Sequence, residues 1–489
     1  MALTKEVYSA IEDVVGAEFI CSDPAIMPSY YNTEFAAVVL PKNTAEVQAV
    51  IKLCNVHNLK FRPICTGWSG KFAAGTVLLD LRRMNHIIEI NEKNMYAVVE
   101  PYVISAELQA ELMKRGLNFC VKGAGTTCSA MLRGHGHMDQ STSGDDRNHL
   151  AIEWVTPEGE IVKSGSLGSS DEWFCGDGPG PSLRSILTSA VPPGTTPGVF
   201  TKAAIKLYHW SGPAAYSSVG KSPKYYLSEI PALMQGRWYS FPNIDKMWNA
   251  EITMGENEIC FELMGLNASM MAANVTTSNE ECVEIFEKMN KEALGPGFYT
   301  IIMGHSAEDF EYKKKAIAKI VADNDGESLK FLETPEYEGI LMAQCTRISA
   351  SIRETFRAGG GFMSIPIMGQ RDLTIKWAIG AGKAKLPLIK AGHIVDDGGG
   401  FFGWGVEQGH LGKTEIFGVY SPANPVATKA LEGWQKEQTE RAFKENYFAS
   451  TMTTSPEINK ALGCYDDWWK KITKAMDPNG ACPAGGSLV

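Results

Sequence analysis

The sequence predicts an α+β protein built from two dissimilar parts, and three observations support this. Residues 35–121 alternate short apolar strands with helical patterns, as βαβ units do. Residues 123–212 are richer in Gly, Thr and Ser and in short strands, which predicts a second α+β lobe. After residue 213 aromatic residues and methionines increase and long amphipathic helices follow, so we expect a domain boundary there.

The elements follow in order. Residues 1–34 indicate an amphipathic helix and a connection. Residues 44–58 have apolar positions at helical spacing, with Thr44 as the expected N-cap, and residues 105–117 repeat the pattern, with Ser105 as cap and Gly116 as stop. Strands are expected at residues 76–81, 96–99 and 150–155. Residues 173–198 are dense in Gly and Pro and predict a long structured loop. Further helices are expected at 279–294 and 307–324, and in the tail 455–480.

Composition excludes several functions. Hydrophobic content of 44% and charged content of 21% are typical of soluble globular proteins. The net charge of −10 gives no support to nucleic-acid binding, and no apolar run approaches the length of a membrane span. The eleven cysteines are scattered without a zinc or iron–sulfur spacing, so reduced, mostly buried thiols are expected. A cytoplasmic location is the default expectation.

The loop after residue 65 carries the first chemical signal. Small residues between two strands let backbone amides face outward and surround an anion such as a pyrophosphate. The two common phosphate loops, GxGxxG opening a helix and GxxxxGK[ST], do not occur here. An ordinary turn is the alternative interpretation of the loop taken alone.

The order of this loop, "VLLDLRRMNHIIEIN" and "AVVEP" resembles the vanillyl-alcohol oxidase / p-cresol methylhydroxylase superfamily, with features of FAD-linked glycolate oxidase and D-lactate dehydrogenase subunits. The stretches 123–165, 197–208 and 474–486 extend the resemblance, which is clear over about 35–212 and 455–489. It implies a two-lobed FAD-binding domain of the p-cresol methylhydroxylase type (residues 1–212), an α+β cap domain over the substrate (213–450) and a C-terminal segment returning to the FAD domain (451–489). The positions it implies for FAD contact are Thr66, Gly67, Trp68, Ser69, Gly70, Lys71, Pro101, Gly125, Thr126, Thr127, Ser129, Gly134, His135, Arg147, His149, Gly198 and Val199.

Proton-handling residues are expected beside the flavin. "SGDDRNHLAIEWV" is similar to family patterns in which an acid lies near flavin N5, and that acid corresponds to Asp145 or Asp146. An acid there can assist hydride transfer or take up a proton. His137 and His410 are further candidates. The alternatives are a turn pair of aspartates and a hydrogen-bonded core histidine.

No metal is expected. The hydroxyacid dehydrogenase branch has a "GHxGDGNxH" motif with two ligand histidines, but here Lys413 replaces the Asp and Phe417 replaces the second His. A cation beside a metal site is electrostatically unfavourable. The linking His of the berberine-bridge type is also absent from the first loop, so FAD is predicted to be non-covalent, with Tyr420 as the alternative attachment residue.

The cap supplies the expected substrate contacts Arg353, Trp404 and Tyr420, although such aromatic residues are more often core. The resemblance implies an FAD-dependent oxidoreductase that takes a hydride from a small hydroxylated substrate, a para-substituted phenol or benzylic alcohol. Alternatives are a 2-hydroxy-acid dehydrogenase, a non-catalytic electron-relay subunit, a redox-neutral flavoenzyme and a structural protein with a degenerate nucleotide fold. The expected partners are the substrate, an electron acceptor (oxygen, a cytochrome, an electron-transfer flavoprotein or an iron–sulfur subunit) and a second copy of the chain.

Overall fold

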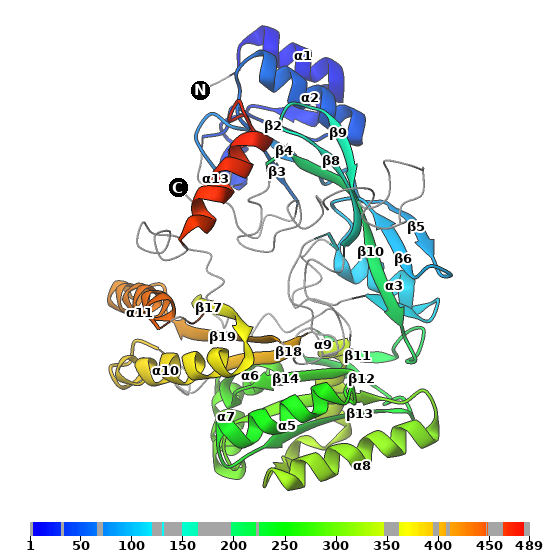
Figure 1. Ribbon diagram of the computed structural model, residues 1–489, viewed down its shortest axis with the longest axis vertical. Helices are drawn as coiled ribbons and strands as arrows, with labels where there is room; N and C mark the ends of the chain where they lie inside the picture. Colours follow the sequence, from blue (N-terminus) through cyan, green and yellow to red (C-terminus); the bar gives the residue numbers. More distant parts are fainter. Residues whose placement is uncertain are drawn as a thin grey trace.

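The structure, a computed structural model, describes residues 3–30, 34–65, 72–119, 130–131, 149–164, 197–221, 224–346, 361–394, 401–406, 411–445, 447 and 463–483. In Figure 1 the strands and helices of residues 5–209 form the upper body, and those of residues 218–444 form the lower one. The red helix α13 (Cys464–Met476) lies with the upper body, although it follows the elements of the lower body in the sequence.

The first lobe is a four-stranded sheet in the order β1-β2-β4-β3. Its strands are β1 (Ile20–Cys21), β2 (Ala37–Val39), β3 (Phe61–Ile64) and β4 (Val77–Asp80). Strand β4 pairs in parallel with β2 and β3 and is buried along its whole length, as expected for the inner strand of a covered parallel sheet. Helices α1 (Lys5–Val15) and α2 (Thr44–Val56) accompany it, together with the short turns η1 (Ala17–Phe19) and η2 (Met27–Ser29).

The N-cap prediction for α2 is wrong by one residue. The side chain of Asn43 accepts the Glu46 amide at 2.9 Å and caps the helix, and Thr44 is its first residue. Thr44 instead directs its hydroxyl to Glu153, 109 positions away. The hydrogen bond of Thr44 to Glu153 thus takes the place of the helix cap that the local sequence predicted.

The second lobe is an antiparallel sheet in the order β5-β6-β10-β8-β9, with β7 also on β10. It contains β5 (Ile87–Asn91), β6 (Tyr96–Val99), β7 (Leu117–Phe119), β8 (His149–Val155), β9 (Ile161–Ser164), β10 (Val199–His209) and helix α3 (Ser105–Met113). The predicted division near residue 122 is therefore wrong, because β5, β6 and β7 belong to this sheet. The 11-residue strand β10 is long enough to pair with β6, β7 and β8 together.

Helix α3 begins one residue earlier than predicted. Ser105 is its first helical residue and is buried, while the Glu107 carboxylate accepts the Ile104 amide at 3.4 Å. Gly116 follows the helix at φ +69°, a left-handed conformation that glycine adopts without strain, as the stop signal predicted.

The lower body is built on a seven-stranded antiparallel sheet in the order β16-β13-β15-β14-β18-β19-β17. Its strands are β13 (Met234–Ser240), β14 (Glu262–Leu266), β15 (Gly297–Met303), β16 (Glu327–Ser328), β17 (Gly361–Gln370), β18 (Phe401–Val406) and β19 (Leu411–Tyr420), and a separate hairpin joins β11 (Ser218–Lys221) to β12 (Lys224–Leu227). Its helices are α5 (Ile244–Glu256), α6 (Ala268–Asn274), α7 (Asn279–Glu292), α8 (Ala307–Asp323), η4 (Lys330–Leu332), α9 (Pro335–Thr346), α10 (Arg371–Lys390) and α11 (Pro425–Lys444).

Side-chain caps start five of these helices. An amide of the first turn donates in each case to the side chain of the residue before α5, α6, α7, α8 and α11, namely Asn243, Asn267, Ser278, Ser306 and Asn424. The amphipathic patterns at 279–294 and 307–324 correspond to α7 and α8, so both helix predictions are confirmed.

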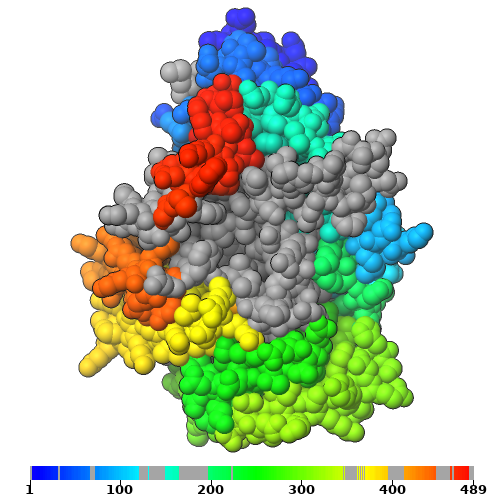
Figure 2. Space-filling model, viewed as in Figure 1, coloured from blue at the N-terminus to red at the C-terminus, as the bar shows by residue number. Residues whose placement is uncertain are grey.

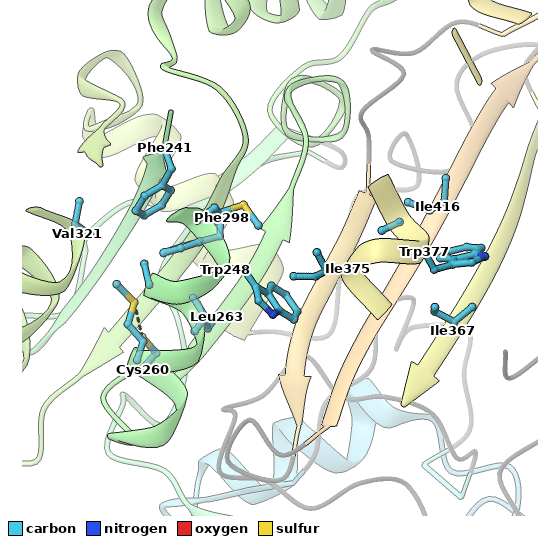
Figure 3. Packing of buried hydrophobic residues seen from close by; sticks show 14 of the residues in the cluster. Phe241, Trp248, Cys260, Leu263, Phe298, Val321, Ile367, Ile375, Trp377 and Ile416 are labelled. Atoms are coloured by element: carbon cyan, nitrogen blue, oxygen red, sulfur yellow. Dashed lines mark hydrogen bonds between the residues drawn. The ribbon is translucent and has the colours of Figure 1, made fainter. Parts of the chain in front are cut away.

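Two large apolar clusters make up most of the core of the lower body. One joins α5, α8 and α10 to the sheet and includes Phe241, Trp248, Phe298 and Trp377 (Figure 3). The other is rich in methionine and includes Trp238 and Tyr299. Met113 of α3 belongs to the second cluster, so the upper body contributes to it.

A hydrogen bond also crosses from one body to the other. The buried Gln109 Nε2 of α3 donates to the Thr346 carbonyl of α9 at 2.7 Å. The C-terminal half of α3 is therefore one place where the two bodies are in contact.

Among the described residues, no helix has the length and apolar character to cross a lipid bilayer. Within the same residues, no cluster of His, Cys, Asp and Glu is placed to hold a metal ion.

Candidate functional site

Most of the predicted site residues lie outside the described ranges. This group comprises Thr66, Gly67, Trp68, Ser69, Gly70, Lys71, Gly125, Thr126, Thr127, Ser129, Gly134, His135, His137, Asp145, Asp146, Arg147, Arg353 and His410. Pro101, His149, Gly198, Val199 and Tyr420 are described, and Trp404 is described as a backbone position of β18. The site is therefore built from the described residues at the edges of the predicted loops.

The parallel pair β3 and β4 ends in a buried carboxylate beside the start of loop 66–71. Asp80 is opposite Ile64 in the register and is 1% exposed. Its Oδ2 accepts Arg82 Nε at 2.7 Å and the Tyr30 hydroxyl at 3.0 Å. Burial and the Asp80 charge raise the pKa of Tyr30 to about 12, so this hydroxyl stays protonated.

Cys65 immediately precedes the same loop. Burial, and secondarily the charge of Asp80, raise the pKa of its thiol to about 12. A thiol that holds its proton is not a nucleophile at neutral pH. Cys65 is partly buried and packs against the apolar cluster of the first lobe, next to the predicted anion loop.

The second predicted loop region is anchored at described points on its scaffold. Pro101 follows β6 and is buried. The Ala130 amide donates to the Val103 carbonyl at 2.7 Å, and the buried His149 Nε2 lies 3.1 Å from the Met131 carbonyl. These contacts bring together the turn after β6, residues 130–131 and the start of β8.

Two acidic side chains near these anchors have hydrogen-bond partners. Glu100 Oε2 accepts the His86 amide at 3.0 Å and lies 2.7 Å from His86 Nδ1, and Asp80 is paired with Arg82. A diphosphate carries negative charge, and unpaired carboxylates beside it would repel it. The surroundings of the predicted loops therefore fit a bound dinucleotide.

Gly198 and Val199 lie at the start of β10, against the end of β8. Gly198 has φ +94°, and a Cβ there would lie 2.4 Å from Trp154 Nε1 and 2.5 Å from the Val155 carbonyl oxygen. Trp154 Nε1 donates to the Pro197 carbonyl at 2.8 Å. Only glycine allows this approach, which fixes the turn that precedes β10.

Glu153 is a buried acid that the sequence did not single out as a site residue. Its Oε1 accepts Thr44 Oγ1 at 2.7 Å and Thr201 Oγ1 at 2.9 Å and lies 3.1 Å from Lys202 Nζ. Burial alone would raise the pKa of Glu153, but these hydrogen bonds and the Lys202 charge hold it below its ordinary value. Because Thr44 begins α2, Glu153 joins the two lobes of the upper body.

The predicted substrate strands of the lower body are adjacent. Trp404 of β18 is opposite Lys413 of β19, and Tyr420 at the end of β19 is opposite Gly361. Phe417, which occupies the position of a family ligand histidine, is 9% exposed and belongs to the methionine-rich cluster. Its carbonyl accepts the fully buried Lys385 Nζ of α10 at 2.8 Å.

Comparison with protein families identifies an FAD binding domain over residues 35–165. Three curated relatives align at low identity. The 1'-carboxy-chondrochloren decarboxylase of Chondromyces crocatus is 26% identical over 205 residues, 37% of each chain. The flavoprotein subunit of 4-cresol dehydrogenase from Pseudomonas putida is 29% identical over 170 residues, 32% of each chain. The probable mitochondrial D-lactate dehydrogenase of Danio rerio is 22% identical over 68% of this chain and 63% of that protein. The chain thus spans about a third of the length of the first two.

Solved structures match over nearly the whole chain. Substrate-bound p-cresol methylhydroxylase has a TM-score of 0.77 at 17% identity and covers 99% of this chain and 98% of its own. The 4-ethylphenol oxidase of Gulosibacter chungangensis has a TM-score of 0.72 at 18% identity and covers 99% and 97%. At these identities the likeness shows the fold of both bodies.

Proposed function

The chain is a flavoprotein with an FAD-binding domain and the fold of p-cresol methylhydroxylase, related to FAD-dependent oxidoreductases, and from this premise we propose its reaction. The proposed activity is the removal of a hydride from a small hydroxylated substrate, a para-substituted phenol or benzylic alcohol. FAD supplies the capacity to accept that hydride at N5. The protein supplies placement, exclusion of water and proton transfer.

The extent of the structural likeness is the strongest support for this proposal. The likeness to p-cresol methylhydroxylase covers 99% of the chain and so includes the lower body as well as the FAD-binding domain. A cofactor domain alone would support many reactions, and the shared fold of the sheet beside it adds an argument by analogy for a similar kind of substrate. Relatives named for a cresol and a chondrochloren derivative add to this support.

We assign the roles as follows. The backbone of residues 66–70 holds the diphosphate, with Lys71 beside it, and the scaffold of Pro101, His149 and Gly198 fixes the surrounding turns. Asp145, Asp146, His137 and His410 are the candidates for taking up the substrate proton. Arg353, Trp404 and Tyr420 are the proposed substrate contacts from the cap. FAD is proposed to be non-covalent.

A 2-hydroxy acid is the second candidate substrate. The D-lactate dehydrogenase relative aligns over 68% of this chain, about twice the share of the 4-cresol dehydrogenase relative. In that case electrons would pass to a partner protein, and Arg353 would pair with the substrate carboxylate.

The test is anaerobic reduction of the FAD-loaded protein, followed as loss of flavin absorbance in a stopped-flow instrument. A panel of 4-alkylphenols, benzylic alcohols, D- and L-2-hydroxy acids and a para-hydroxylated aromatic acid separates the substrate classes. We expect only the phenols or benzylic alcohols to bleach the flavin within seconds, and dithionite serves as the positive control. Bleaching by hydroxy acids alone would establish the second candidate, and dithionite reduction without any substrate response would indicate an electron-relay subunit.

Acid precipitation of the same sample tests the mode of attachment. Non-covalent FAD leaves the precipitate and colours the supernatant. Yellow colour that stays with the pellet would overturn that part of the proposal, and loss of the colour in Tyr420→Phe would then identify the attachment residue.

A further inference from the structure

The residues after α13 fold back onto the first lobe. We call residues 477–483 the C-terminal hook. Figure 2 shows the red C-terminal part of the chain lying against the blue and teal surface of the N-terminal lobes. Asn479 Nδ2 donates to Asn55 Oδ1 at 3.3 Å, which joins the hook to α2.

A buried aspartate shapes the hook. Asp477 is 5% exposed, and its two oxygens accept the amides of Ala481 and Cys482, each at 2.9 Å. These bonds close a tight turn at the end of α13, and this turn directs Cys482 into the core beside α2.

The hook covers the free edge of β3. This strand is at the end of its sheet and pairs only with β4 among the described strands. The Phe61 amide donates to the Ala481 carbonyl at 2.9 Å, and Arg62 Nη1 donates to the Pro483 carbonyl at 2.9 Å. The hook therefore sets the position of β3, the strand that leads directly into residues 66–71.

The sulfur of Cys482 connects this edge to a second predicted cofactor contact. Cys482 is fully buried, and burial raises the pKa of its thiol, while the nearby Arg62 charge and the Gly198 amide act against this rise. Cys482 also packs in one cluster with Phe61, Val155 and Val199. The Cys482 side chain thus packs in the cluster that joins β3 to the start of β10.

We propose that Cys482, held by Asp477, is a positioning residue for FAD: it keeps β3 and the Gly198 turn at the separation that the bound dinucleotide needs. This inference rests on the proposed placement of FAD on residues 66–71 and at Gly198. If FAD binds only when the hook is closed, bound FAD stabilises the closed hook by the same free energy. The hook should then open more readily after FAD is removed.

Thiol labelling measures this opening directly. Trypsin places Cys482 in peptide 475–489, Cys54 in peptide 53–60 and Cys464 in peptide 461–470, each as the single cysteine. Cys464 is exposed and reports complete labelling, whereas Cys54 is buried in the same cluster as Cys482 and reports unfolding of the lobe. Iodoacetamide labelling with and without FAD, quantified by mass spectrometry, gives the three rates.

We expect Cys482 to react at least about tenfold faster in the FAD-free protein, with Cys54 unchanged. Equal acceleration of both cysteines would mean that the lobe opens as a unit, and a Cys482 rate independent of FAD would mean that the hook is only structural. Either result overturns the proposal.

Variants provide an independent readout. Asp477→Asn keeps the size of the side chain but replaces one acceptor with a donor, and we expect it to raise the Kd of FAD at least about tenfold with little change in the melting temperature of the FAD-free protein. Cys482→Ser keeps an acceptor and should bind FAD more tightly than Cys482→Ala, and Cys54→Ser is the matched control. Equal losses of stability with and without FAD, at unchanged Kd, would contradict a positioning role.

FAD binding by the wild-type protein and by the hook variants distinguishes failure of the proposed function from failure of the hook proposal. If the wild-type protein binds no FAD, the proposed function fails as well. If it binds FAD normally in every hook variant, only the role of the hook fails.

Discussion

Replacement of Glu153 tests how the two lobes of the FAD-binding domain are held together. In Glu153→Gln, the remaining Oε1 can still accept the hydroxyls of Thr44 and Thr201, but an amide nitrogen replaces Oε2, which lies 3.3 Å from Lys202 Nζ. In Glu153→Ala all of these partners lose their acceptor. The pair of variants therefore separates the charge from the hydrogen-bond acceptor.

The expected losses differ in size. Removing one partner of a buried ion pair costs about 3–5 kcal/mol, and Glu153 is 3% exposed, so we expect this range for the alanine variant. The glutamine variant keeps Oε1 near Lys202 but loses the negative charge and the Oε2 acceptor, and because Lys202 is 28% exposed this should cost about 1–2 kcal/mol. For a domain of this size each kcal/mol lowers the melting temperature by about 2–4 °C.

The dependence on pH gives a second check. Because the folded pKa of Glu153 lies below its ordinary value, its charge stabilises the fold above the ordinary pKa, and this stabilisation is lost as the pH falls through the folded pKa. Thermal unfolding of the full chain between pH 3 and pH 7 should thus show a steeper acid-side loss for the wild type than for Glu153→Gln. Equal melting temperatures for the two variants at pH 7, or parallel pH profiles, would refute the reasoning.

Two further substitutions test buried features of the structure. Glu251 of α5 is 1% exposed, neither of its oxygens has a hydrogen-bond partner in the described structure, and burial raises its pKa well above the ordinary value. The unfolded chain releases this proton at lower pH than the folded one. Wild-type stability, relative to Glu251→Gln, should therefore fall as the pH rises from the ordinary pKa to the raised folded pKa, with a slope of at most about 1.4 kcal/mol per pH unit. Urea midpoints of both proteins at pH 5, 6, 7 and 8 measure the difference, and parallel midpoints would contradict it. Gly198→Ala should destabilise the domain by about 1–3 kcal/mol or more, because its Cβ overlaps Trp154 and Val155. Gly392→Ala is the control for backbone strain alone, because Gly392 has φ +73° and its Cβ would meet no atom of the described residues within 4 Å. An equal melting-temperature loss in both variants would show that the overlap at Gly198 is relieved.

Local patterns predicted the individual elements well. The strand at residues 96–99 matches β6, and the helices at 279–294 and 307–324 match α7 and α8 within two residues. In these segments the periodicity of apolar residues and the caps lie close together in the sequence, so a single window contains the signal.

The predictions that were wrong depend on pairing between residues far apart in the sequence. The division between the lobes was misplaced because Val99 pairs with Ala203, and nothing near Val99 indicates this partner. Thr44 resembles a helix cap in the sequence, but its partner Glu153 lies in another lobe. Among the predicted site residues that the structure describes, His149 and Gly198 are buried in the scaffold, while the chemical roles rest on the family resemblance.

The C-terminal hook also affects when the first lobe can be completed during translation. Arg62 and Pro483 are 421 positions apart, so the edge of β3 stays uncovered until the hook has been synthesised and has left the ribosome. The nascent first lobe therefore presents an unpaired strand edge for most of translation, which is the kind of surface that chaperones protect. Coenzyme loading is consequently expected to follow translation of this segment, and ribosome-bound chains arrested before residue 477 should emerge colourless.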